Sequence, residues 1–166
     1  MTLYQSLAPV YDHLFPIDPR AAAFLDALVT SASRPAYPRL LDAGCATGGH
    51  ALALAALGWK ATGIDSEAVM IAAARESAGR AGDLGERASF FEADMLGIAK
   101  EFRGESFDLI LCLGNTLPHL IGQGALDFLG QARSLIAPGG ALVLQTLNFS
   151  LPRIAPGFSF PELSGA

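Results

Sequence analysis

The sequence predicts an α/β domain, a doubly wound parallel sheet with helices on both faces. Short apolar runs alternate with longer helical segments from residue 39 onward. The run 107–113, FDLILCL, is apolar nearly throughout, which is typical of a strand covered on both faces. Because strands alternate with helices, the connections should cross over the sheet and keep the strands parallel.

The elements follow in order along the chain. Asp18-Pro19 is a helix-start signal, because aspartate caps a helix and proline suits its first turn. The helix that follows is expected over 21–32, ended by Pro35 and Pro38. The remaining expected segments are strands at 40–43, 60–64, 88–92, 107–113 and 141–147, and helices at 50–57, 67–78 and 124–136, the last stopped by Pro138-Gly139-Gly140.

A single domain is expected over 1–166, with an N-terminal arm and helix over 1–37, a core over 38–147 and an irregular tail over 148–166. Nothing after the fifth strand resembles two further strands, so the C-terminal strands of a full nucleotide-type sheet are expected to be missing. Either the chain is a fragment, or the edge of a small sheet is covered by the tail or by a second subunit, which makes a homodimer one interpretation.

The amino-acid composition limits the kinds of ligand and partner that the protein can have. The chain has 16 acidic and 11 basic residues, and its arginines are scattered singly, whereas a nucleic-acid surface needs clustered cations. We therefore expect a small-molecule substrate and no nucleic acid. No apolar run approaches the roughly 20 residues of a membrane span, and the N-terminus lacks a basic signal region, which predicts a cytoplasmic protein without membrane association. No metal is expected, because His13, His50 and His119 are far apart and neither Cys45 nor Cys112 is in a CxxC pair.

A glycine-rich loop at 44–49 lies between the first strand of the core and the next helix. Glycines permit a tight turn there and let a ligand approach the backbone, although the same loop can be a purely structural turn. Asp65 closes the next strand, 23 residues after Asp42. In open α/β sheets an acid at about this distance binds the ribose hydroxyls of a nucleoside, since a carboxylate accepts two hydrogen bonds. Asp65 can also simply cap the following helix.

Asp94-Met95 ends the third strand. Asp94 can accept a hydrogen bond from an adenine amino group, and Met95 can pack on the ring. The alternative is a loop acid followed by a core methionine.

Several strings together resemble the motifs of class I S-adenosylmethionine-dependent methyltransferases. They are LLDAGCATGGHALALAALGWKATGIDSEAVMIAAA, FFEADML, SFDLILCLGNTLPHL and LIAPGGALVLQT. They cover roughly residues 38–147, and their order is more specific than any one of them. The segment YQSLAPVYDHLF resembles the arm before the fold in small-molecule members, and LCLGNTLPHL is similar to the equivalent segment of glycine and sarcosine N-methyltransferases.

The resemblance implies a Rossmann-like sheet of order 3-2-1-4-5 and S-adenosylmethionine as cofactor. Asp42, Gly44 and Gly48 would line its methionine end. Asp65 would hold the ribose, with Ser66 and Met70 near the adenine. Asp94 and Met95 would bracket the adenine, and Leu113, Gly114 and Asn115 would border the sulfonium and the substrate opening.

One position departs from the family pattern. Ala46 stands where the family loop usually has glycine, and a positive φ there would cost energy and weaken cofactor binding. The same fold binds dinucleotides, but the spacing Gly44-x-x-x-Gly48-Gly49 is not GxGxxG, and no hydride-transfer residues are obvious. A nicotinamide-dependent oxidoreductase is therefore the third interpretation.

The remaining candidate residues would act on the molecule that accepts the methyl group. His119 follows the fourth strand and can take a proton from an amine or hydroxyl group, or it can be an ordinary loop histidine. Tyr11 can cover the cofactor or simply pack, and Tyr4, Asn115 and His50 are further candidates. The leading interpretation is methyl transfer to a small molecule, with an amine nitrogen implied by the resemblance. The alternative is a module that binds S-adenosylmethionine or a related nucleoside without a complete substrate lobe.

Overall fold

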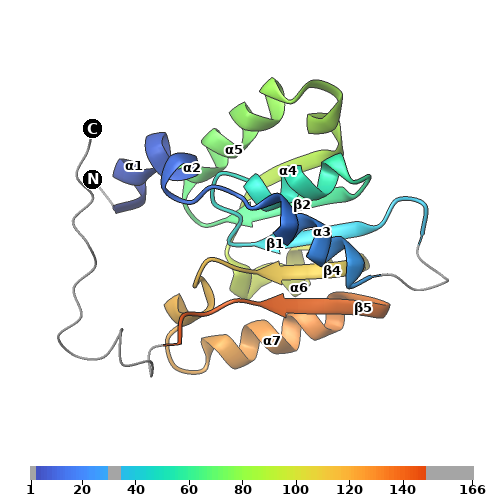
Figure 1. Cartoon of the computed structure of the whole chain (residues 1–166). Coiled ribbons are helices and arrows are strands. Elements are labelled where there is room, and N and C mark those ends of the chain that lie inside the picture. The colour runs from blue at the N-terminus through green and yellow to red at the C-terminus, as the bar shows by residue number, and fades with distance from the viewer. Residues whose placement is uncertain (1–2, 30–34, 149–166) are drawn as a thin grey trace.

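The computed structural model describes residues 3–29 and 35–148 as five parallel strands flanked by helices (Figure 1). The strands are β1 (Arg39–Ala43), β2 (Lys60–Asp65), β3 (Ala88–Glu92), β4 (Phe107–Cys112) and β5 (Ile136–Leu144). Their order is β3-β2-β1-β4-β5, as predicted, and every neighbouring pair is parallel. The chain reverses its direction of winding between β1 and β4, and ligands of open α/β sheets bind at such a switch point.

Helices cover both faces because successive strand residues point to opposite sides. Leu40 belongs to a cluster with residues of α3 (Pro19–Ala27), α4 (Gly49–Ala56) and α5 (Ala68–Arg80). Leu41 belongs to a second cluster, with residues of α6 (Ile98–Glu101) and α7 (Gly124–Leu135). This alternation produces a three-layer domain with one apolar core on each side of the sheet.

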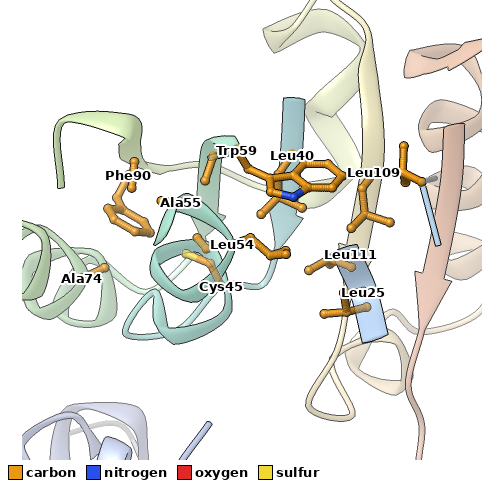
Figure 2. Packing of buried hydrophobic residues seen from close by; sticks show 14 of the residues in the cluster. Leu25, Leu40, Cys45, Leu54, Ala55, Trp59, Ala74, Phe90, Leu109 and Leu111 are labelled. Carbon is orange, nitrogen blue, oxygen red and sulfur yellow. The ribbon is translucent and has the colours of Figure 1, made fainter. Parts of the chain in front are cut away.

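The first cluster is anchored by Trp59, whose side chain is fully buried between α3 and the sheet (Figure 2). Its indole Nε1–H donates to Asp26 Oδ1 of α3 at 2.6 Å, so the polar edge of the ring is satisfied. Leu54 and Leu109 pack in the same cluster (Figure 2). This packing fixes α3 and α4 against the sheet and thereby fixes the loop between β1 and α4.

The start of α3 was predicted correctly, and its end was not. Asp18 Oδ1 accepts from the backbone N–H of Arg20 at 2.8 Å, which confirms the cap. The helix ends at Ala27 rather than at residue 32, and residues 30–34 lie outside the described residues. The other expected helix and strand boundaries agree to within two residues, with the exception of β5.

The expected stop at Pro138-Gly139-Gly140 was wrong. Helix α7 ends at Leu135, and those three residues lie inside β5. Ile136 already pairs with Phe107, and the register then shifts before Ala141 pairs with Leu109. Among the described residues the strand pairs with β4 on one side only, where an irregular stretch tolerates a proline that cannot donate a ladder hydrogen bond. The predicted strand 141–147 therefore begins earlier and ends at Leu144, and most of the predicted tail, 149–166, lies outside the described residues.

The N-terminal arm consists of short helical pieces. These are α1 (Leu3–Leu7), the 3-10 turn η1 (Ala8–Val10) and α2 (Tyr11–Leu14). Both α1 and η1 pack against α5, and Figure 1 shows the arm beside the sheet. Three further 3-10 segments are η2 (Gly82–Arg87), η3 (Met95–Gly97) and η4 (Leu117–His119). Within 3–29 and 35–148, no helix has the length and apolarity needed to cross a bilayer.

Candidate active site

A cavity of about 340 Å³ opens at the carboxyl edge of the sheet. Its walls come from the residues that follow β1, β2, β3 and β4, together with the arm. The lining residues are Tyr4, Tyr11, Gly44, Ala46, Asp65, Ser66, Glu67, Met70, Ala93, Asp94, Met95, Gly114, Thr116, His119 and Leu120. Its size lies within the range of small-molecule sites, and its place matches the switch point of the sheet.

Glycine is required at two positions of the loop between β1 and α4. Gly44 has φ +82°, and a Cβ there would lie 2.5 Å from Thr116 Cγ2. Gly48 has φ +83°, and a Cβ there would lie 2.6 Å from the ring of Phe90. Gly44 therefore lets the segment after β4 approach the cavity, whereas Gly48 serves packing against β3.

Ala46 also has a positive φ, 47°, in a region that L-residues seldom adopt. The expected cost of alanine at this position is thus present in the structure. The Asp65 side chain holds the strained turn in place, because its Oδ2 accepts from the Ala46 backbone N–H at 2.9 Å.

Asp65 also forms the turn that leads into the next helix. Its Oδ1 accepts from the Glu67 backbone N–H at 3.0 Å, just before α5 begins. Glu67 is itself the N-cap residue and α5 has no side-chain cap, so the capping role weighed against ribose binding is not borne out. The turn and ribose binding are compatible, since each carboxylate oxygen has two lone pairs and each uses one for the protein.

Asp42 is buried in β1, with 2% of its surface exposed. Burial, and secondarily the charge of Asp65, raises the pKa of the Asp42 carboxyl to about 7. Among the described residues its Oδ2 is buried and has no hydrogen-bond partner. A buried carboxylate oxygen without a partner is costly unless a cation or a donor reaches it.

Two buried methionines form the apolar wall of the cavity. Met70 of α5 is 1% exposed and Met95 of η3 is 9% exposed. The side chain of Asp94 accepts from the Leu96 backbone N–H at 2.8 Å and so caps η3. Asp94 is itself exposed at the cavity rim, where a further acceptor position remains for a ligand.

The cavity lining also includes aromatic and basic groups. Tyr4 of α1 and His119 of η4 are in contact, with 3.3 Å between Tyr4 Oη and His119 Nε2. Burial, followed by the charges of Asp65 and Glu67, raises the pKa of Tyr4. Burial also raises the pKa of Tyr11, so both phenols keep their protons at neutral pH.

The arm is fastened to the glycine loop. The Thr47 hydroxyl, 4% exposed, hydrogen-bonds to Asp12 Oδ1 of α2. The side chain of Ile17 lies over Gly49, where a Cβ would come within 2.6 Å of it. Both contacts hold this N-terminal segment against the glycine loop.

Most of the predicted site residues lie together in this cavity. Those are Gly44, Asp65, Ser66, Met70, Asp94, Met95, Gly114, Tyr11 and His119. Asp42, Gly48, Leu113 and Asn115 do not line it. Asn115, with φ 64°, accepts a hydrogen bond from the Leu147 backbone N–H through its side-chain oxygen, and Leu113 packs against the first core cluster.

Sequence reasoning missed four lining residues: Glu67, Ala93, Thr116 and Leu120. Each adjoins a residue that was singled out, so extending every motif by one position would have found them. Glu67 and Thr116 add a carboxylate and a hydroxyl group to the cavity wall.

Burial shifts the pKa values of three further groups near the loop. Burial raises the pKa of Cys45 strongly and raises that of Cys112 to about 11, so neither is a ready thiolate. Burial lowers the pKa of His50 in α4. Within the described part of the chain, no group of three or more His, Cys, Asp or Glu side chains is placed to hold a metal ion.

Comparison with known proteins defines the class. Residues 40–140 match the model of the family described as "Methyltransferase domain". The chain belongs to this methyltransferase domain family, which confirms the resemblance to class I S-adenosylmethionine-dependent methyltransferases.

Individual relatives are similar over part of their length. The chain is 28% identical over 140 residues to a glycine/sarcosine N-methyltransferase of Halorhodospira halochloris, covering 84% of this chain and 51% of that protein. It is 33% identical over 118 residues to a ubiquinone biosynthesis O-methyltransferase of Caulobacter sp. (strain K31), covering 70% and 44%. The CcbJ methyltransferase from Streptomyces caelestis superposes with a TM-score of 0.69 at 32% identity, covering 83% and 54%. The chain thus spans about half the length of the curated relatives it matches.

Proposed function

We propose that this chain binds S-adenosylmethionine in the cavity at the carboxyl edge of the sheet and transfers its methyl group to the amine nitrogen of a small molecule. The observation that carries the proposal is the position of Asp65. Its carboxylate closes β2 at the cavity and contacts the glycine loop through the Ala46 backbone N–H. An acid there suits the paired hydroxyls of a ribose.

The chain's own residues fit this cofactor. Asp65 would hold the ribose, and Met70 and Met95 would flank the adenine, with Ser66 and Asp94 near its polar edge. The unpartnered Asp42 Oδ2, two residues before Gly44, suits a ligand that brings a cationic amino group to the loop. When bound, the cofactor supplies an electrophilic methyl group.

The acceptor would enter beside the arm, where Tyr4, Tyr11 and His119 line the cavity. These residues would orient the nitrogen toward the methyl group and exclude water, which are the main contributions that such a reaction needs from a protein. His119 would be the final acceptor of the proton that the nitrogen loses, since histidine exchanges protons near neutral pH.

An amine is preferred to a hydroxyl acceptor on two grounds. Glycine/sarcosine N-methyltransferases are among the relatives, and CalS10, described as an amino pentose methyltransferase from Micromonospora echinaspora, is 27% identical with a TM-score of 0.65. In addition, Asp65, Glu67 and Asp94 give the cavity wall three carboxylates, which attract cationic or basic ligands.

The experiment is a methyl-transfer assay on matched acceptor pairs, each an amine and the alcohol of the same skeleton, with S-adenosylhomocysteine quantified as product. Methylation of the amines and not of the alcohols is expected. Methylation of the alcohols alone would refute the amine assignment while leaving the cofactor assignment intact.

A further inference from the structure

The feature that carries a further inference is the contact between Tyr4 and His119. These residues are 115 positions apart, yet Tyr4 Oη lies 3.3 Å from His119 Nε2 and the rings meet edge-on, with centroids 6.4 Å apart. Both side chains line the cavity. The pair therefore joins the arm to the segment after β4 at the acceptor side of the site.

The chemistry of the two groups fixes the direction of this hydrogen bond. A phenol is a good donor and a poor acceptor, whereas an unprotonated imidazole nitrogen is a good acceptor. Burial and the charges of Asp65 and Glu67 disfavour a phenolate on Tyr4, so its proton stays in place. The favoured arrangement has the Tyr4 O–H donating to Nε2, which places the ring proton of neutral His119 on Nδ1.

We propose that Tyr4 is a proton-relay residue between the acceptor nitrogen and His119. The proposal rests on the proposed function. As the methylated nitrogen loses its proton to Tyr4 Oη, the phenolic proton moves to His119 Nε2. One proton enters the pair and the phenol is restored, so no phenolate forms, and His119 becomes the imidazolium.

This arrangement gives the N-terminal arm a chemical role besides covering the cavity. Tyr4 belongs to α1, and the arm that carries it is fastened to the glycine loop through Asp12 and Thr47. The relay is complete only while the arm lies in place. An acceptor nitrogen would therefore meet its proton acceptor after the arm has closed over it.

The first test uses the free protein and needs neither cofactor nor turnover. The tautomer of neutral His119 is read from the ¹⁵N chemical shifts of its ring at a pH above its titration. The wild type should show the proton on Nδ1, and Tyr4→Phe should move it to Nε2. Tyr37→Phe is the matched control, because Tyr37 is exposed outside the cavity. A wild-type His119 protonated on Nε2 would overturn the relay.

The second test is a double-variant cycle on methyl transfer to an amine. Tyr4→Phe should lower kcat by about a hundredfold, the size of a proton-transfer contribution, while the Kd for S-adenosylhomocysteine changes less than about twofold. Tyr4→Phe combined with His119→Ala should be no slower than the slower single variant, because both break one pathway. If the kcat losses of the two single variants instead multiply in the double variant, the relay is overturned. A wild-type chain that does not bind S-adenosylhomocysteine would instead overturn the proposed function.

Discussion

The side-chain Oδ2 of Asp65 accepts a hydrogen bond from the backbone N–H of Ala46 at 2.9 Å. One carboxylate thus ties the end of β2 to the strained turn after β1, and its other oxygen accepts from the Glu67 backbone N–H just before α5. The glycine loop and the end of β2, which would both bind the cofactor, are thus held by the same side chain. Substitutions at either residue should therefore affect both stability and ligand affinity.

Replacing Ala46 with glycine should stabilise the protein. A non-glycine residue at φ 47° costs roughly 1–2 kcal/mol, and glycine returns part of that gain through the entropy of the unfolded chain. We expect a net gain of about 0.5–1 kcal/mol in the free energy of unfolding, measured by urea denaturation, and tighter binding of S-adenosylhomocysteine. Ala72→Gly, at an exposed position inside α5, is the control and should destabilise the protein by a similar amount. Destabilisation by both substitutions would mean that Ala46 is not strained.

Replacing Asp65 with alanine should weaken cofactor binding by at least about a hundredfold, because two hydrogen bonds to a charged acceptor are lost, each worth about 1.5–3 kcal/mol. The free energy of unfolding should fall as well, by about 1–3 kcal/mol, because the hydrogen bonds to the Ala46 and Glu67 backbone N–H groups are also lost. Titration calorimetry measures the first quantity and denaturation the second. Glu92→Ala removes an exposed carboxylate at the end of β3 and should change neither. A stability loss without an affinity loss would leave Asp65 with a structural role only.

The free energy of unfolding should depend on pH through Asp42. Its carboxyl group has a pKa near 7 in the folded protein and an ordinary value near 4 when unfolded. Between these values the folded state binds more protons, so stability falls as pH rises, by up to ~4 kcal/mol in all. Asp42→Asn, a neutral group of the same shape, should remove this component. Parallel stability curves for the wild type and Asp42→Asn from pH 4 to pH 8 would contradict the account.

The contact between Asp12 and Thr47 should control how tightly the arm is held. Thr47→Val keeps the shape of the buried side chain and removes its hydroxyl, and with it the hydrogen bond to Asp12. Amide hydrogen exchange in residues 3–14 should then accelerate severalfold, while exchange in the core strands stays unchanged. Thr62→Val, in the partly buried centre of β2, is the matched control. Unchanged exchange in the arm of Thr47→Val would show that packing on α5 suffices to hold it.

The sequence was informative where local chemistry decides the structure. Alternating apolar segments identified all five strands, and Asp18 marked the start of α3. It was misleading at Pro138-Gly139-Gly140, because the pairing of Ile136 with Phe107 draws a typical turn signal into an edge strand. No local pattern could reveal that outcome.

In the candidate site, too, local motifs were informative and tertiary contacts were not predictable. Residues within recognisable motifs, such as Asp65 and Met95, line the cavity, whereas their roles toward a cofactor stay predictions. Gly48 lies outside its lining, because a residue in a ligand-binding loop can serve packing instead, here against Phe90. The contact between Tyr4 and His119 joins residues 115 positions apart, and only the tertiary fold brings them together.

The central claim is that the cavity beside Asp65 accepts a sulfur-bearing nucleoside and not a dinucleotide. Titration calorimetry of the wild-type chain with S-adenosylhomocysteine, and separately with NAD, tests it most directly. The account predicts saturable one-to-one binding of S-adenosylhomocysteine that Asp65→Ala abolishes or strongly weakens, and no binding of NAD. Binding of NAD with no response to S-adenosylhomocysteine would contradict it.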